Sequence, residues 1–125
     1  MTGAEGLNRI NDTDSIDNIK EITKVFVNKV DPLKVILFGS FAEGSYNDES
    51  DYDFYIVVDD ERNVSEATDD AYIAAMGIKR RPVDIVVGTN RRFEQKRNSR
   101  HSLMIEREVE RNGILLYDRM TGAMV

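Results

Sequence analysis

The spacing of apolar residues alternates along the chain between a helical and a strand period. Apolar side chains recur every three or four positions over residues 16–30, which predicts an amphipathic helix capped by Asp14 or Ser15. The pair Asp31-Pro32 ends this helix, because the residue before a proline is pushed out of the helical region. The run 34–38, rich in β-branched and aromatic residues, then predicts a buried strand.

The remainder of the chain continues this alternation. Gly39 breaks the first strand, and Ser40 can cap a short helical turn that reaches about Gly44. Strands are predicted at 51–58, 83–87 and 114–117, and helices at 65–76, from residue 89 or 90 to 97, and again from Ser102. This order predicts a small α/β (α+β) fold, in which helices pack on a small mixed β-sheet to bury its apolar surface.

Length and composition narrow the class of protein. At 125 residues the chain is expected to form one domain, 13–118, between a flexible N-terminus, 1–12, and a flexible tail, 119–125. The first residues lack the basic and apolar regions of a signal peptide, and no apolar run approaches the ~20 residues that cross a bilayer. The absence of cysteine excludes disulfides and thiolate chemistry. We therefore expect a cytoplasmic protein without a membrane partner.

Charge is distributed unevenly along the chain. The net charge of −6 argues against broad nucleic-acid binding, so no direct nucleic-acid binding is expected. Residues 1–78 carry 6 basic and 17 acidic side chains, whereas residues 79–100 carry 8 basic and 2 acidic ones. Such a division suits a site that holds metal on one side and phosphate on the other; solvated helix faces are the alternative.

Two predicted strands carry carboxylates among apolar residues. Asp51 and Asp53 lie two positions apart, so their side chains share one face with Cα atoms ~6.5–7 Å apart. Asp84 interrupts the apolar run 83–87, where an acid is costly unless it has a partner. If the strands are neighbours, the three carboxylates converge and favour one or two Mg²⁺ ions, which can clamp a phosphoryl transfer. The alternatives are a solvated strand start and an Arg81–Asp84 ion pair.

A glycine-serine turn lies upstream of these acids. Gly39 and Ser40 follow a buried strand and open a helical turn. Glycine lets the backbone approach a phosphate closely, and N–H groups at a helix start point toward an anion. The sequence GSFAEGSY lacks the Gly-Lys-Ser/Thr ending of a Walker A loop. The turn therefore predicts a phosphate site of another kind.

Together these elements resemble the signature of the nucleotidyltransferase (polymerase β-like) superfamily. They are Gly39-Ser40, ten intervening residues, Asp51-x-Asp53, and Asp84 on a later strand. More narrowly, the chain resembles the minimal nucleotidyltransferases that serve as antitoxins to HEPN-domain toxins. The resemblance implies the nucleotidyltransferase fold, with Gly39 and Ser40 on the β- and γ-phosphates of ATP and Asp51 and Asp53 on Mg²⁺. It also implies that Asp84 binds a second metal and helps deprotonate the acceptor hydroxyl, which receives AMP as pyrophosphate leaves.

The resemblance covers residues 16–117 and departs from the superfamily pattern at one position. Members often carry an arginine in the segment after Gly-Ser, where this chain has Glu43; Arg91 or Arg92 can supply the missing cation. The chain has no room for a second domain, so we expect the acceptor to come from a HEPN-type toxin, through its tyrosine, or from a homodimer. The alternatives are an aminoglycoside-type small-molecule nucleotidyltransferase and a catalytically weak module that neutralises a partner by contact.

Two further features, the acidic pair Asp59-Asp60 and the single histidine, are not assigned a catalytic role. The sequence YIVVDDER resembles the acidic pair of receiver domains, but Asp59 and Asp60 lie near mid-chain and no later strand supplies a phosphoacceptor aspartate. His101, the only histidine, is interpreted as a polar helix-end residue.

Overall fold

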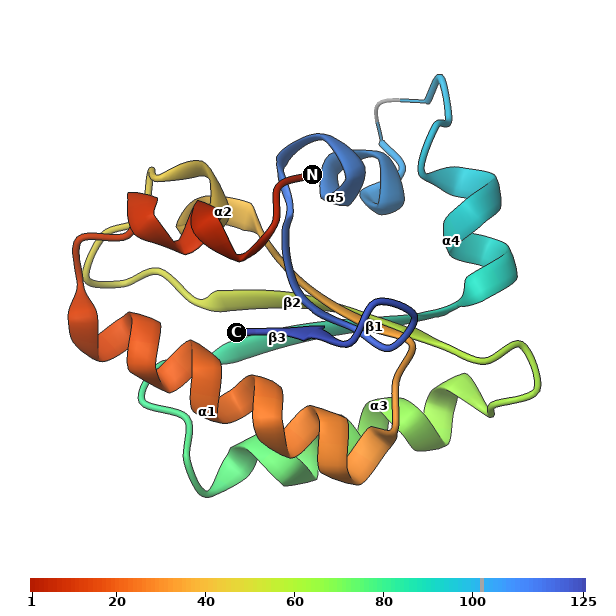
Figure 1. The fold of residues 1–125 in the computed structure, drawn as a ribbon, viewed down its shortest axis with the longest axis horizontal. Helices are drawn as coiled ribbons and strands as arrows, with labels where there is room; N and C mark the ends of the chain where they lie inside the picture. Colours follow the sequence, from red (N-terminus) through yellow and green to blue (C-terminus); the bar gives the residue numbers. More distant parts are fainter. Residues whose placement is uncertain (102) are drawn as a thin grey trace.

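A mixed sheet in the order β3-β2-β1-β4-β5 forms the centre of the computed structural model, which describes residues 1–101 and 103–125 (Figure 1). The strands are β1 (Lys34–Phe38), β2 (Tyr52–Val58), β3 (Val83–Thr89), β4 (Ile114–Asp118) and β5 (Ala123–Met124). The helices are η1 (Ala4–Arg9, 3-10), α1 (Thr13–Val30), α2 (Gly39–Glu43), α3 (Val64–Met76), α4 (Asn90–Lys96) and α5 (Ile105–Asn112). The predicted α/β fold with a small mixed sheet packed by helices is confirmed.

Strand directions place the two acid-bearing strands next to each other. β1 runs antiparallel to β2 and β4, whereas β2 runs parallel to β3. A parallel pair needs a crossover, and α3 supplies it between β2 and β3. Figure 1 shows α1 and α3 together below the sheet and α4 and α5 above it. The sheet is therefore covered on both faces.

The alternation along β2 divides the core into two parts. Phe54 and Ile56 point toward α1 and α3 and belong to the larger cluster of buried side chains. Tyr55 and Val57 point the other way and pack in a smaller cluster with Phe93 of α4 and residues of α5. Because both faces of this strand are buried, polar residues are accommodated only at its ends, and Asp53 lies at its N-terminal end.

Both predicted caps in the first half of the chain are wrong. Asp12 caps α1, since its carboxylate accepts the Ser15 N–H at 3.3 Å and the Ser15 hydroxyl at 2.8 Å. Asp14 instead forms an ion pair with Arg80, which comes from a distant part of the sequence. α2 begins at Gly39 without a side-chain cap, so Ser40 lies inside this short helix. The cap positions depend on tertiary partners that local sequence preference does not include.

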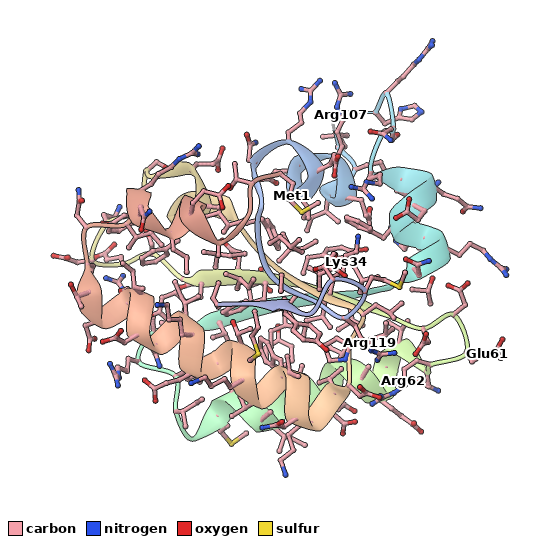
Figure 2. All side chains as sticks on the ribbon, in the orientation of Figure 1. Met1, Lys34, Glu61, Arg62, Arg107 and Arg119 are labelled. Atoms are coloured by element: carbon pink, nitrogen blue, oxygen red, sulfur yellow. The ribbon has the colours of Figure 1, made fainter. Side chains whose placement is uncertain are left out.

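The first twelve residues differ from the flexible segment expected from their composition. They contain η1, and Leu7 and Ile10 are buried in the larger core. Thr2 forms an isolated parallel bridge with Ile114, the first residue of β4. Figure 2 shows Met1 beside α5, where its ammonium group donates to the Glu110 carbonyl.

The C-terminal tail, also expected to be flexible, forms a strand pair in the structure. β5 pairs antiparallel with β4, and the N–H of Val125 donates to the Leu116 carbonyl at 3.0 Å. Both chain ends thus pair with the otherwise free backbone edge of β4. Because this pairing joins residues far apart in the sequence, local sequence patterns do not predict it. The predicted helix start at Ser102 lies outside the described residues. Within the described ranges, no helix combines the length and apolarity needed to cross a membrane.

Candidate active site

The three predicted acids lie at one end of the paired strands β2 and β3. Asp53 is directly opposite Asp84 in the parallel register, so both carboxylates point to the same face of adjacent strands. Asp51 precedes Asp53 by two residues, just before β2 begins. Adjacent strands are about 4.8 Å apart, and the charges of Asp84 and Asp51 both act on Asp53. The structure therefore brings the three acids together.

The Gly39 turn lies directly against Asp53. Phe38, the last residue of β1, is paired with Asp53, and Gly39 follows at a φ of 73°. A Cβ atom at position 39 would lie only 2.1 Å from the Asp53 Oδ2 atom. Glycine is thus required here both by the left-handed backbone and by the neighbouring carboxylate. Ser40 is next in the chain and is half-buried, so the predicted phosphate turn borders the acids.

The charge of these acids is not neutralised by nearby cations. Burial raises the pKa of Asp53 to about 6, with further contributions from the charges of Asp84, Asp51 and Glu108. Among the described residues, no lysine or arginine forms an ion pair with any of the three aspartates. A carboxylate whose ionised form is disfavoured in this way gains from a bound cation.

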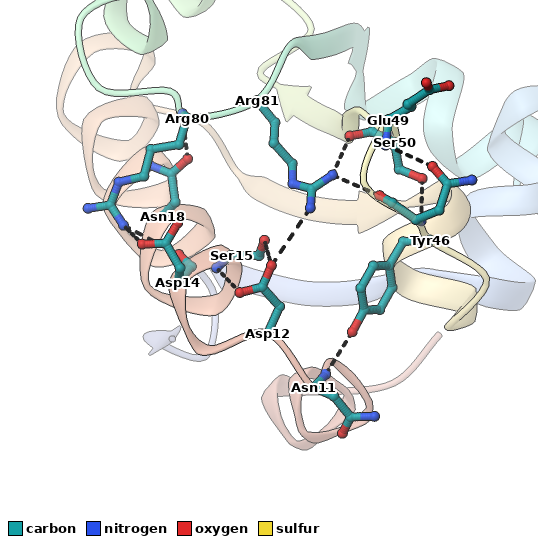
Figure 3. A network of polar contacts seen from close by, with 11 residues as sticks. Asn11, Asp12, Asp14, Ser15, Asn18, Tyr46, Glu49, Ser50, Arg80 and Arg81 are labelled. Atoms are coloured by element: carbon teal, nitrogen blue, oxygen red, sulfur yellow. Dashed lines mark hydrogen bonds and ion pairs between the residues drawn. The ribbon is translucent and has the colours of Figure 1, made fainter.

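The alternative to a metal site was an ion pair between Arg81 and Asp84, and Arg81 does not form it. Its guanidinium donates to the carbonyl groups of Asn47 at 2.8 Å and Ser50 at 3.1 Å, and lies 3.7 Å from the Asp12 carboxylate (Figure 3). Arg81 therefore fastens the loop before β2 to the start of α1. Asp84 remains exposed beside Asp53.

The donor chemistry fits Mg²⁺, although the ligands are not assembled around a metal position. Oxygen-only carboxylate donors with uncompensated charge suit a hard divalent cation that keeps several waters. Among the described residues, however, no three acidic or histidine side chains are arranged to hold a metal ion. Asp53 is held against Gly39, whereas Asp51 and Asp84 are exposed to solvent.

Sequence analysis missed Tyr72, which contacts the third acid. Its hydroxyl accepts the Ile85 N–H at 3.0 Å and lies 3.5 Å from Asp84 Oδ1, a long contact in which it acts as donor. Tyr72 comes from α3, on the other side of the sheet, and reaches the outer edge of β3. Its position in an apolar helical pattern gave no signal of this contact.

The arginines predicted to replace the missing cation lie away from the acids. Arg92 donates from Nε to the buried Glu106 carboxylate at 2.9 Å, and Tyr55 donates to the same oxygen at 2.6 Å. Burial alone would raise the pKa of Glu106, but these two hydrogen bonds outweigh it and leave the pKa below its ordinary value. Arg91 donates its backbone N–H to Asp60. Both arginines follow the C-terminal end of β3, whereas Asp84 lies near its start.

Two other arginines, both on α5, line a cavity together with acidic residues. A cavity of about 270 Å³ beside α2 and α5 is lined by Arg107, Arg111, Glu43 and Glu108, together with Asn112. Burial, and then the charge of Glu43, raises the pKa of Glu108, which in turn adds to the negative charge around Asp53. Figure 2 shows Arg107 on α5 at the rim of the molecule. Glu108 is therefore the lining residue of this cavity whose charge acts on Asp53.

Known proteins provide separate evidence on the family and the fold. A sequence profile of the family described as Polymerase beta, Nucleotidyltransferase matches residues 20–121. The chain belongs to the polymerase beta nucleotidyltransferase family. A crystal structure from Sulfolobus solfataricus, of a protein provisionally assigned as a nucleotidyltransferase, has the same fold as this family member. Its TM-score is 0.56 at 23% identity over 97% of this chain and 91% of that one. No curated protein matches the sequence.

Proposed function

We propose that this family member is a Mg²⁺-dependent nucleotidyltransferase that moves AMP from ATP to an acceptor hydroxyl. The observation that carries the proposal is the register of β2 and β3, which sets Asp53 opposite Asp84 beside the Gly39 turn. Membership of the family supports nucleotidyl transfer in general. The choice of Mg²⁺ and ATP rests on the carboxylate donors and on the resemblance of the motif.

Each residue then has a distinct task. Asp51, Asp53 and Asp84 would hold one or two Mg²⁺ ions, which neutralise phosphate charge during an in-line displacement. Gly39 brings the backbone close to the phosphates, and the Ser40 hydroxyl donates a hydrogen bond to them. Asp84, the exposed acid on the edge strand, also accepts the proton of the acceptor hydroxyl. Catalysis would rest mainly on positioning and charge neutralisation.

Arg107 and Arg111 are the cations we assign to the triphosphate. Both line the cavity that also contains Glu43, the residue that stands where superfamily members often carry an arginine. They are one helical turn apart on α5, so their guanidinium groups can act on one polyanion. This assignment replaces Arg91 and Arg92.

We further propose that the acceptor is the tyrosine of a HEPN-type toxin partner, so that the chain acts as an antitoxin. The observation for a second candidate function, a contact-only binding module, is the pair Glu43 and Glu108 beside the phosphate turn. Burial is the main cause of the raised pKa of Glu108, and the charge of Glu43 raises it further. Two acids therefore border the place where a triphosphate would lie. Such an arrangement weakens ATP binding.

Incubation with labelled ATP and Mg²⁺ tests these candidates, with and without the product of the adjacent gene and with an aminoglycoside panel in parallel. Asp53→Asn should abolish labelling, whereas Asp48→Asn, which changes an exposed loop acid, should not. A contact-only antitoxin would neutralise its partner equally well as the Asp53→Asn variant. Label on an aminoglycoside would instead identify a small-molecule enzyme, and no transfer with any nucleotide would refute the enzymatic proposal.

A further inference from the structure

The hydroxyl of Tyr72 lies where an acceptor hydroxyl should lie relative to Asp84. Its ring comes from α3, is 37% exposed, and reaches the edge strand β3. There the hydroxyl accepts the Ile85 N–H at 3.0 Å, which leaves its proton free to point at Asp84 Oδ1, 3.5 Å away. A nucleophile held by one partner, with its proton directed at a carboxylate, is the arrangement that general-base catalysis requires.

The other tyrosines are not placed in this way. The hydroxyl of Tyr52 is buried, and that of Tyr55 donates to the buried Glu106. The hydroxyl of Tyr46, in the loop before β2, accepts the backbone N–H of Asn11. Within the described part of the chain, Tyr72 is the tyrosine whose hydroxyl contacts one of the three site acids.

We propose that Tyr72 is a self-modification site, and that the chain transfers a nucleoside monophosphate to its own Tyr72 hydroxyl. This inference rests on the proposed function, and it names an acceptor within the chain itself. The Tyr72 oxygen attacks the α-phosphorus of the nucleoside triphosphate and forms a new P–O bond. The bond between the α-phosphorus and the bridging oxygen breaks, and pyrophosphate leaves. The phenol proton passes to the Asp84 carboxylate and from there to solvent.

The geometry also makes this reaction self-limiting. The product is a phosphodiester with one negative charge, attached beside Asp84 on the edge strand. The Tyr72 hydroxyl is used up in this reaction, so the same side chain cannot accept a second nucleotide. Each chain should therefore take up a single nucleotide, at a rate that does not depend on protein concentration.

The test uses the purified full-length chain with ATP and Mg²⁺ and no other protein. Intact mass spectrometry should show a gain of one AMP per chain, together with one equivalent of pyrophosphate. Trypsin should place the label in fragment 63–79, which contains Tyr72 and no other tyrosine. Tyr72→Phe should lose the label, whereas the matched variant Tyr46→Phe should keep it. Thermal unfolding of both variants verifies that they are folded.

The outcomes separate this inference from the proposed function. Label on another residue, label retained by Tyr72→Phe, or a first-order rate constant per chain that rises with protein concentration would overturn Tyr72 as an internal acceptor. An unlabelled chain that still transfers AMP to a separate acceptor would also overturn it, while leaving the proposed function intact. Failure to release pyrophosphate with any nucleotide or acceptor would refute both.

Discussion

Replacing Gly39 with alanine tests whether the turn after β1 shapes the acid site. A Cβ atom at position 39 would lie 2.1 Å from Oδ2 and 2.9 Å from Cγ of Asp53. Non-bonded carbon and oxygen atoms need more than 3 Å, so the carboxylate must move by about 1 Å or the turn must shift. The backbone φ of 73° adds left-handed strain of about 1–2 kcal/mol for any residue with a Cβ.

Gly44 provides a matched control at the other end of α2. It also has a positive φ, 81°, but a Cβ there meets no atom within 4 Å. Gly44→Ala should therefore lower the free energy of unfolding by about 1–2 kcal/mol, through backbone strain alone. Its rate of nucleotidyl transfer should be unchanged. Gly39→Ala should lose this amount or more, and its transfer rate should fall about 100-fold, because a displacement of 1 Å at a reacting centre has that effect.

Two measurements decide between these expectations. Urea unfolding gives the free energy of unfolding of each variant, and pyrophosphate release gives the rate of transfer with ATP and Mg²⁺. Equal stability and equal transfer rates in the two alanine variants would refute the reasoning, since the contact with Asp53 would then have no consequence. A lower rate in Gly44→Ala than in Gly39→Ala would also contradict it.

Three further predictions follow from the same structure. The raised pKa of Asp53, about 6 against 3.8 in an unfolded chain, means that the folded protein keeps a proton which the unfolded chain releases. In metal-free buffer this residue should therefore lower the free energy of unfolding as pH rises from about 4 to 6, and Asp53→Asn should remove that slope in urea titrations; an unchanged slope contradicts this. Tyr55→Phe, which deprives a buried carboxylate of a donor, should cost about 1–3 kcal/mol in urea unfolding, and an effect no larger than that of Tyr46→Phe would count against the network. Changing Arg107 and Arg111 together to glutamine should raise KM for ATP about tenfold or more in steady-state assays, and an unchanged KM would exclude them from phosphate binding.

The buried carboxylate of Glu106 explains how α4 and α5 are attached to the sheet. Its side chain is 1% exposed, and its Oε2 atom accepts from both Tyr55 of β2 and Arg92 of α4. The other oxygen, Oε1, is buried without a protein partner among the described residues. Because loss of one partner from a buried charge is costly, this network fixes the orientation of α5. That orientation in turn determines where Glu108, Arg107 and Arg111 lie relative to the acids.

The sequence predicted those parts of the fold that depend on local periodicity. Alternation in the second strand predicted that Asp51 and Asp53 share a face, although Asp51 lies just before β2 in the structure, and the apolar run around Asp84 marked it as an exception. The Gly39-Ser40 pair between a strand and a helical turn was likewise visible, and all these elements are present in the structure. Periods of two and of about four residues follow from backbone geometry alone, so these features require no knowledge of neighbours.

Tertiary structure alone decided which of these elements meet. Only the pairing of β2 with β3 sets Asp53 opposite Asp84, and only the pairing of β1 with β2 presses Gly39 against Asp53. The same holds for Tyr72 at the strand edge and for Arg92, which is bound to Glu106 instead of reaching the acids. These contacts join residues far apart in sequence, and their energy depends on packing and desolvation in the folded state. Local sequence preferences do not specify which distant residues become neighbours, so the assembled site could be recognised only in the tertiary structure.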